Sequence, residues 1–343
     1  MKNPFVTNGY VSPEYFCDRE KETAKIVSLL TNENNIALIS PRRLGKTDLL
    51  RHCFGQPEIK EHYHTFIIDI YATSSVRDFV NVFGKAVLDE LRPKGKSVWG
   101  TFLNVLASLR SEITFDMNGQ PTWGIGLGAI TNPSATLDEI FSYLNNAGKP
   151  CLIAIDEFQQ ITKYADDPNI EAALRTHIQR CSNAHFVFSG SHRHLMGAMF
   201  TSPARPFYQS VTLINLPPIS VDKYAEFCLK HFERVSKHLD TLVVTELYER
   251  FNGITSYMQK VMNILFSMTG TGEICIPSMI DTAINDLLDF SADTYDALLY
   301  QMPEKQRIVF MAIAAEGKAK AISSGDFVRK YKIAICQFCL FKL

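Results

Sequence analysis

The sequence predicts an α/β fold with a parallel sheet, followed by a helical segment and a short C-terminal unit. Short apolar runs typical of buried strands alternate with helical patterns up to Pro217, and this alternation indicates parallel strands joined by helices. Two of the runs, Cys151–Ile155 and Phe186–Phe188, are apolar on both faces, as buried parallel strands should be. After Pro217 and Pro218 the strand signals stop, and the pattern is helical to about residue 287.

Each element follows from its own pattern. The strand pattern is found at Ile36–Ile39, His64–Tyr71, Pro150–Ile155, His185–Ser189 and Ser210–Leu216. The helical pattern between them is found at Lys46–Phe54, Ser75–Leu91, Val98–Leu109, Thr136–Asn146 and Ile170–Cys181. Ile113–Leu127 alternates instead and contains Asn118-Gly119, a strong turn signal, so we predict a β-hairpin insertion over residues 113–127. Two more helices are predicted at Pro303–Glu316 and Ser323–Tyr331.

The composition excludes several classes of protein. The chain has 343 residues and a net charge of -1, so any contact with nucleic acid or an anionic membrane must be local. The first residues lack the apolar core of a signal peptide, and the longest apolar runs are too short to span a bilayer. We therefore expect a cytoplasmic protein without a membrane contact. Cys336 and Cys339 form a single C-x-x-C pair, which does not by itself make a zinc site.

Residues 40–47 have the spacing of a phosphate-binding loop, except that Ser40 replaces the usual first glycine. The loop follows a predicted strand and opens a predicted helix, where free backbone amides and the helix dipole favour phosphate. Gly45 lets the backbone approach the phosphates, Lys46 reaches the β- and γ-phosphates, and the Thr47 hydroxyl ligates Mg²⁺. A chance Gly-Lys-Thr is the alternative, and the flanking strand and helix disfavour it. The residues expected at the nucleotide are Ser40, Pro41, Arg42, Arg43, Leu44, Gly45, Lys46, Thr47 and Asp48.

Two carboxylates, Asp156 and Glu157, follow the buried strand Cys151–Ile155 at its carboxyl end, the edge where open α/β sheets bind ligands. We expect Asp156 to hold Mg²⁺, directly or through water, and Glu157 to act as general base on the attacking water. Alternation along the strand would point the two side chains in opposite directions. The alternative role for the pair is an N-cap of the following helix.

A second polar strand end follows His185–Ser189. Ser189 and Ser191 are both candidates to sense the γ-phosphate, with an ordinary turn as the alternative. Phosphoryl transfer also favours an arginine against the developing charge. The sequence does not rank the four arginines in suitable positions, which are Arg175, Arg180, Arg193 and Arg205. From this strand end we take Ser191 and Arg193 as the catalytic candidates.

Five segments together resemble the archaeal-type ATPases of the STAND branch of P-loop NTPases, relatives of the AAA+ proteins. They are Pro13–Glu22, Leu38–Leu50, Cys151–Ile161, Phe186–Met196 and Phe207–Ser220. The resemblance implies an AAA+-like α/β core over residues 1–217, a helical lid over 218–290 and a winged-helix-like unit over 294–343. It also implies that Phe16–Glu20 lie near the adenine or its pocket, where Arg19 and Glu20 match the family's Arg-Glu pair. The family's Gly-x-Pro turn in the lid corresponds to Gly253-Ile254-Thr255, where the proline is missing.

The C-terminal unit departs further from the family. After Tyr331 neither a capped recognition helix nor a wing hairpin is apparent, so we interpret residues 294–343 as a partial, truncated winged helix. A basic cluster within it is interpreted as a solvated face, with nucleic-acid binding as the alternative. The cluster consists of Lys318, Lys320, Arg329, Lys330 and Lys332.

Two functions are favoured by these patterns. The first is an ATPase that binds ATP with Mg²⁺ and uses its hydrolysis to drive a conformational switch. The second is a nucleotide-gated module that binds DNA or a protein with negligible turnover, and self-association is a further possibility. Glu157 favours the ATPase, because a pure switch does not need a placed base. A GTPase is a weaker option, because the nearest match to a base-reading motif, Thr162–Asp166, is one residue too long, and the acidic pair argues against a small-molecule kinase.

Overall fold

The computed structural model describes residues 3–91, 113–115, 121–123, 132–317 and 319–333. It divides into two compact units, Met1–Pro277 and Ser278–Leu343, and each is described by itself. The predicted helix Val98–Leu109 and the Cys336/Cys339 pair lie outside the described residues. Within the described residues, no helix combines the length and the apolar character needed to cross a membrane.

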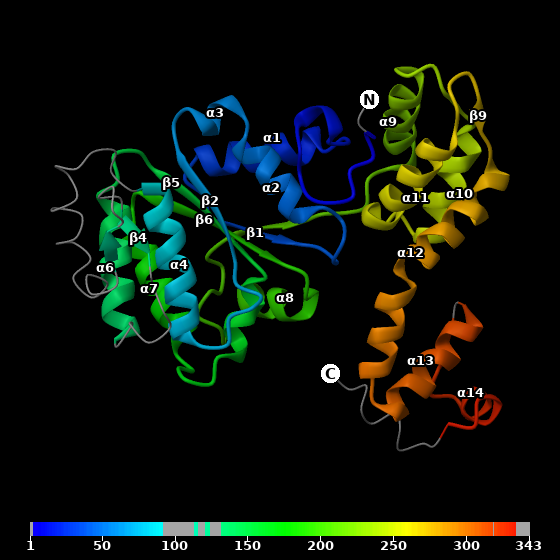
Figure 1. Cartoon of the computed structure of the whole chain (residues 1–343). Helices are drawn as coiled ribbons and strands as arrows, with labels where there is room; N and C mark the ends of the chain where they lie inside the picture. The colour runs from blue at the N-terminus through cyan, green and yellow to red at the C-terminus, as the bar shows by residue number, and fades with distance from the viewer. Residues whose placement is uncertain (1–2, 92–112, 116–120, 124–131, 318, 334–343) are drawn as a thin grey trace. The chain divides into compact units, whose positions relative to one another are not determined.

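The first unit contains the predicted parallel sheet (Figure 1). Its five strands are β1 (Ile36–Ile39), β2 (His64–Asp69), β5 (Cys151–Asp156), β6 (Ala184–Gly190) and β7 (Thr212–Asn215). They lie in the order β2-β5-β6-β1-β7, and all pairs are parallel. β6 therefore separates the strand that precedes the phosphate loop from the strand that ends in Asp156. The α/β fold class is confirmed, and the five predicted strands are all present.

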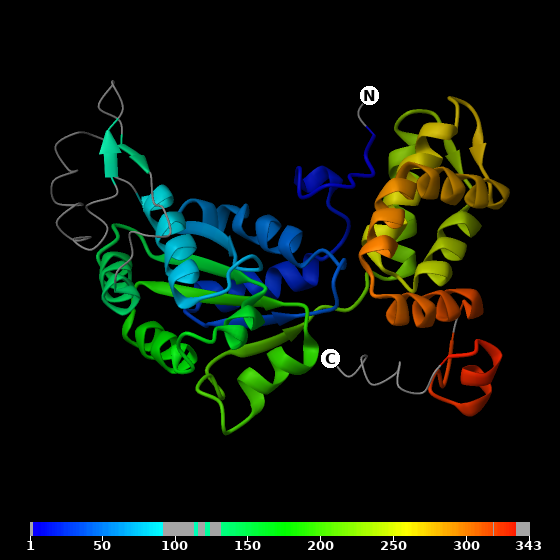
Figure 2. The ribbon, with the colours of Figure 1, turned by 60° about the horizontal axis from the view of Figure 1, so that its bottom comes forward.

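Helices cover both faces of this sheet (Figures 1 and 2). On one face lie α1 (Glu20–Thr31), α2 (Lys46–Phe54) and α3 (Pro57–Lys60). On the other lie α4 (Val76–Leu91), α6 (Pro133–Asn145), the 3-10 helix η4 (Phe158–Lys163), α7 (Ile170–Arg180) and α8 (Arg193–Thr201). The sequence patterns do not predict α1, α3 or α8, and the short 3-10 helix η1 (Pro13–Tyr15) precedes α1.

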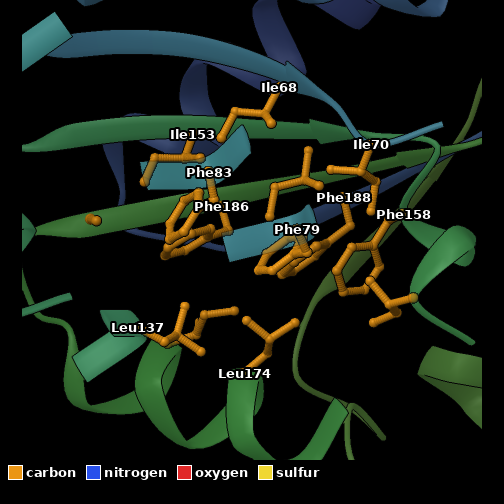
Figure 3. Packing of buried hydrophobic residues seen from close by; sticks show 14 of the residues in the cluster. Ile68, Ile70, Phe79, Phe83, Leu137, Ile153, Phe158, Leu174, Phe186 and Phe188 are labelled. Carbon is orange, nitrogen blue, oxygen red and sulfur yellow. The ribbon is translucent and has the colours of Figure 1, made fainter. Parts of the chain in front are cut away.

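The larger core is rich in phenylalanine (Figure 3). Phe79 and Phe83 of α4 belong to the same buried cluster as Phe186 and Phe188 of β6. Phe158 packs at 4.4 Å, centroid to centroid, from Phe188 and lies directly after the acidic pair. The rigid packing of this aromatic core fixes the carboxyl ends of β5 and β6, which carry the polar residues of interest.

Two short strands lie in the segment for which the sequence predicts a hairpin. β3 (Ile113–Phe115) and β4 (Pro121–Trp123) pair antiparallel, with Ile113 opposite Trp123. The Asn118-Gly119 turn lies outside the described residues.

The helical segment after β7 also belongs to the first unit. It contains α9 (Val221–Glu233), β8 (His238–Leu239), α10 (Thr241–Phe251), α11 (Thr255–Met268) and β9 (Ile274–Cys275). The breaks coincide with the predicted ones near Gly253 and Gly270, but the small β8-β9 sheet was not predicted. Phe5, from the chain's N-terminal segment, is fully buried among Phe227, Phe232 and Phe266 of these helices.

The second unit begins at Ser278, inside the 3-10 helix η5 (Pro277–Met279). It contains α12 (Ile280–Gln301), α13 (Glu304–Glu316) and α14 (Gly325–Lys330). A small core of Val309, Ala312, Phe327 and Ile333 joins α13 to α14. Residues 290–294, the predicted limit between lid and C-terminal unit, fall inside α12.

Candidate nucleotide site

The phosphate loop connects the end of β1 to the first residue of α2. Gly45 precedes the helix with a φ of +83°, a left-handed value that glycine adopts without strain. The ammonium group of Lys46 donates to the carbonyl oxygens of Ser40 (3.1 Å) and Pro41 (3.3 Å). Ser40 is fully buried, and its amide donates to the Gly190 carbonyl oxygen at 3.4 Å. Ser40 thus continues the pairing of β1 with β6, a position that has no need of the usual glycine.

The acidic pair meets this loop across the sheet edge. The Thr47 hydroxyl, in the first turn of α2, donates to Oδ2 of Asp156 at 2.5 Å. Oδ1 of Asp156 accepts the amide of Glu157 at 3.0 Å. Neither carboxylate caps η4, because its N-cap position makes no side-chain hydrogen bond, so the capping alternative is excluded. Contact between residues 109 positions apart shows that the two sequence motifs converge on one place.

Glu157 lies just past the end of β5 and has a φ of +54°. The prediction that strand alternation separates the two carboxylates is therefore wrong, because the chain turns at Glu157 instead of continuing the strand. Oε2 of Glu157 accepts hydrogen bonds from Ser191 Oγ at 2.9 Å and from Gln159 Nε2 at 2.5 Å. These two donors hold the carboxylate in one orientation.

Two cationic side chains, Arg42 and Lys46, lie near the two carboxylates. Nη2 of Arg42 lies 3.9 Å from Oε2 of Glu157, and Nε donates to Ser191 Oγ at 3.4 Å. Burial lowers the pKa of Lys46, and the neighbouring Asp156 and Glu157 oppose this shift by stabilising the ammonium form. The two carboxylates thus favour the charged form of Lys46, against the effect of its burial.

A cavity of about 340 Å³ opens over the loop. One end is polar and is formed by Arg42, Arg43, Leu44, Gly45, Lys46, Thr47, Asp48, Asp156 and Glu157. Burial raises the pKa of Asp48 there. The other end is largely apolar and includes Val6, Tyr10, Val11, Phe16 and Ile219. The volume lies within the range of small-molecule sites, roughly 300–1,000 Å³.

The apolar end is built by the N-terminal segment, residues 3–19. Asn3 Nδ2 donates to the Asn263 carbonyl oxygen at 2.8 Å, and Asn263 Nδ2 donates to the Phe5 carbonyl oxygen at 2.7 Å. Further along, Phe16 stacks on His52 of α2 at 4.4 Å, and the Tyr10 hydroxyl hydrogen-bonds His52 Nδ1 at 3.1 Å. The segment is thus fastened to α11 at one end and to α2 at the other.

The start of α11 closes the remaining side of the cavity. Thr255, Ser256 and Gln259 line it. The Ser256 amide donates to the Arg43 carbonyl oxygen at 3.2 Å, and Nη1 of Arg43 donates to the Tyr257 hydroxyl. The Thr255 hydroxyl is buried and has no hydrogen-bond partner within the described part of the chain.

Comparison with known families identifies the chain. Residues 16–261 match the ATPase domain found predominantly in Archaea, and residues 293–336 match a probable winged helix domain. The chain belongs to this archaeal-type ATPase family. A search of curated proteins gives no match.

Solved structures share the fold of this ATPase family member. A Walker-type ATPase of Pyrococcus abyssi is 17% identical, with a TM-score of 0.59, 96% of this chain covered and 87% of the other. The ORC2 protein of Aeropyrum pernix, in ADPNP-ADP complexes, is 14% identical, with a TM-score of 0.59 and coverage of 100% and 85%. The ORC1 protein of Aeropyrum pernix in complex with DNA is 14% identical, with a TM-score of 0.55 and coverage of 93% and 78%. At these identities the likeness concerns the fold.

Of the Arg-Glu pair predicted to lie near the adenine, Arg19 lines the cavity and Glu20 does not. Arg19 lines it, but its guanidinium donates to Glu22 Oε1 at 3.0 Å and to the Pro217 carbonyl oxygen at 2.7 Å. Glu20 is exposed, does not line the cavity, and has a pKa lowered mainly by a hydrogen bond with Asp18.

Of the residues predicted at the end of β6, only Ser191 contacts the acidic pair among the described residues. Ser191 reaches Glu157, whereas Arg193 is exposed at the start of α8 and does not line the cavity. Ser189 is fully buried, and its hydroxyl has no partner among the described residues. In the part of the chain that the structure describes, no group of three or more His, Cys, Asp or Glu side chains could hold a metal ion.

Several residues that line the cavity or contact its lining were not predicted from the sequence. Tyr10 and Val11 lie in an irregular segment that carries no motif, and Gln159 follows the acidic pair without a known spacing. Tyr257 lies more than 200 positions from the loop that it contacts. A periodicity or a short motif reports local structure, so it gives no signal for contacts that tertiary packing creates.

Proposed function

We propose that this chain binds ATP with Mg²⁺ in the cavity and hydrolyses it. The 2.5 Å contact between the Thr47 hydroxyl and the Asp156 carboxylate carries the proposal. A hydroxyl and a carboxylate are oxygen ligands, and Mg²⁺ is usually held by only one or two protein groups together with waters and substrate phosphates. The residues therefore fit the ion. Thr47 and Asp156 would hold the ion, which would neutralise part of the phosphate charge.

The polar end of the cavity suits a triphosphate. The amides around Gly45 lie at the N-terminus of α2, where the helix dipole favours anions. The Ser40 and Pro41 carbonyl oxygens hold Lys46 against the loop, and from there its ammonium group would contact the phosphates. The apolar end, with Tyr10 and Phe16, would receive the base.

Glu157 is proposed as the general base. Hydrogen bonds from Ser191 and Gln159 orient its carboxylate at the polar end of the cavity. From there it would accept a proton from the water that attacks the γ-phosphate. Ser191 is thus proposed to position the base, while the exposed Arg193 has no support from the cavity geometry.

A conformational switch is supported by the contacts between loop and α11. Arg43 belongs to the phosphate loop, and both its carbonyl oxygen and its guanidinium bind the start of α11. A change in the phosphates beside the loop would therefore reach the proposed lid through Arg43. This contact does not need the family's missing proline.

Phosphate release from ATP tests the proposal. Wild type and Glu157→Gln are compared, with Glu58→Gln, an exposed glutamate on α3, as the matched control. We expect a loss of roughly 10²–10⁴-fold for Glu157→Gln, the usual contribution of general base catalysis, and wild-type rates for the control. Absence of ATP-dependent release by wild type, or an unchanged rate in Glu157→Gln, would reject it.

The second candidate is a nucleotide-gated module that binds DNA. The probable winged helix domain over residues 293–336 favours it, as does the fold shared with an ORC1 protein solved with DNA. The basic cluster gives less support, because Arg329 pairs with Asp326 and Lys330 pairs with Glu316. Fluorescence anisotropy of labelled duplex DNA measures the affinity of the protein for DNA with and without ATP. An affinity that changes with ATP supports this candidate, and the absence of DNA binding rejects it.

A further inference from the structure

Hydrolysis of ATP produces extra negative charge on the transferring phosphoryl group, and an arginine commonly stabilises it. Among the described residues, the cavity is lined by three arginines: Arg19, Arg42 and Arg43. The four arginines that the sequence offered for this role, Arg175, Arg180, Arg193 and Arg205, do not line it. Arg205 is moreover paired with the buried carboxylate of Glu171.

Two of the three lining arginines already have strong partners. Arg19 is 3% exposed and is bound by Glu22 and the Pro217 carbonyl oxygen. Arg43 donates to the Tyr257 hydroxyl, and its guanidinium carbon lies 5.0 Å from the centre of the Tyr257 ring. Their guanidinium groups are therefore engaged in holding the structure around the cavity.

Arg42 is held differently. Its side chain is 55% exposed, and its guanidinium carbon lies 5.4 Å from the centre of the Tyr71 ring. Its separation of 3.9 Å from the Glu157 carboxylate is longer than the ~2.7–2.9 Å of a direct charge-assisted hydrogen bond. The guanidinium therefore sits beside the proposed base without a short hydrogen bond to it. Its Nε donates a long hydrogen bond to Ser191 Oγ at 3.4 Å, and its Nη donors can turn toward a phosphate.

We propose that Arg42 contacts the γ-phosphate and stabilises the transition state of hydrolysis in cis. This inference rests on the proposed function. The water oxygen forms a bond to the γ-phosphorus while the bond from that phosphorus to the β–γ bridging oxygen breaks. The water proton goes to Glu157, and ADP and phosphate leave. The planar fork of Arg42 donates hydrogen bonds to the γ-phosphate oxygens throughout.

Because Arg42 belongs to the same chain as the phosphate loop, ATP turnover should not require a second copy of the protein. An arginine on the same chain is present at every site, whatever the protein concentration. Turnover per site should therefore be constant as the protein is diluted, whereas an arginine supplied by a neighbouring copy would be lost on dilution.

The test compares wild type, Arg42→Ala and Arg42→Lys, with Arg77→Ala, an exposed arginine on α4, as control. Steady-state kinetics should show kcat reduced about 10³-fold or more in Arg42→Ala, at the lower limit known for such arginines. Arg42→Lys should remain strongly impaired, because lysine keeps the charge but lacks the fork. Equal kcat in Arg42→Ala and wild type, or turnover that falls on dilution, overturns the inference.

Calorimetry with ADP and a non-hydrolysable ATP analogue gives a second readout. Arg42→Ala should lose affinity for the analogue and keep its affinity for ADP, because only the analogue has a γ-phosphate. Equal losses for both ligands contradict a γ-phosphate contact. If wild type binds but does not hydrolyse ATP, the proposed function fails, while a selective loss of analogue binding still supports the contact of Arg42.

Discussion

Gly190 ends β6 beside the proposed general base, and a single added methyl group there tests the packing of the site. A Cβ atom at this position would lie 2.4 Å from Gln159 Oε1 and 2.6 Å from both Cγ and Sδ of Met196. All three separations are well below van der Waals contact. Gln159 and Met196 are both buried, so neither side chain can move aside without disturbing its neighbours.

The expected cost follows from this crowding. Overpacking a filled core by a methyl group costs typically 1–3 kcal/mol, and we expect Gly190→Ala to lower the free energy of unfolding by about that amount. The function should suffer as well, because Gln159 donates to the Glu157 carboxylate. Displacing Gln159 would remove one of the two donors that orient the proposed base.

Urea denaturation followed by circular dichroism measures the change in stability, and phosphate release measures the change in activity. Gly197→Ala is the matched control, because Gly197 lies inside α8 and a Cβ atom there would meet, apart from its chain neighbours and its own helix backbone, no atom of the described residues within 4 Å. Alanine in a helix is favoured over glycine by about 0.5–1 kcal/mol, so the control should be slightly stabilised. If Gly190→Ala denatures at the same urea concentration as wild type, the described packing around β6 is wrong.

Two further predictions concern stability. Burial lowers the pKa values of four histidines: His52, His177, His185 and His231. Below an unfolded-state pKa of about 6.5, the unfolded chain binds more protons than the folded one, so the free energy of unfolding should fall as pH is lowered from 7.5 to 5.5. Urea midpoints at the two pH values check this, and a higher midpoint at pH 5.5 would contradict it. Tyr257→Phe removes the hydroxyl that accepts from Arg43, a bond worth about 0.5–1.5 kcal/mol net, and should loosen α11 from the phosphate loop. Hydrogen exchange at the start of α11 measures the loosening, and unchanged exchange would count against the proposed coupling.

The sequence predicted those parts of the site that local chemistry determines. The five strands were visible because buried parallel strands are short and apolar. The loop from Ser40 to Thr47 and the acidic pair were visible because phosphate binding and metal binding need particular residues at particular spacings. Their meeting across the sheet edge, Thr47 to Asp156, follows from the rule that ligand sites lie at the carboxyl ends of parallel strands.

The rest of the site depends on packing between distant segments. The N-terminal segment reaches the cavity because Phe5 is buried among three phenylalanines of α9 and α11. The sequence around Phe5 has no pattern that predicts these packing partners. Strand alternation predicts opposite directions for Asp156 and Glu157, but the positive φ of Glu157 turns the chain instead. Arg42 was assigned to phosphate binding as one loop residue among several. Only its position beside Glu157, compared with the paired states of Arg19 and Arg43, distinguishes it.

The central claim is that the phosphate loop and Asp156 form one site for a nucleoside triphosphate with magnesium. Calorimetric titration of ATP with Mg²⁺ into wild type and Lys46→Ala tests it most directly. A hydrogen bond to a charged group is worth about 1.5–3 kcal/mol, so the variant should bind ATP roughly 10- to 100-fold more weakly than wild type. Equal affinities in the two proteins would contradict the claim.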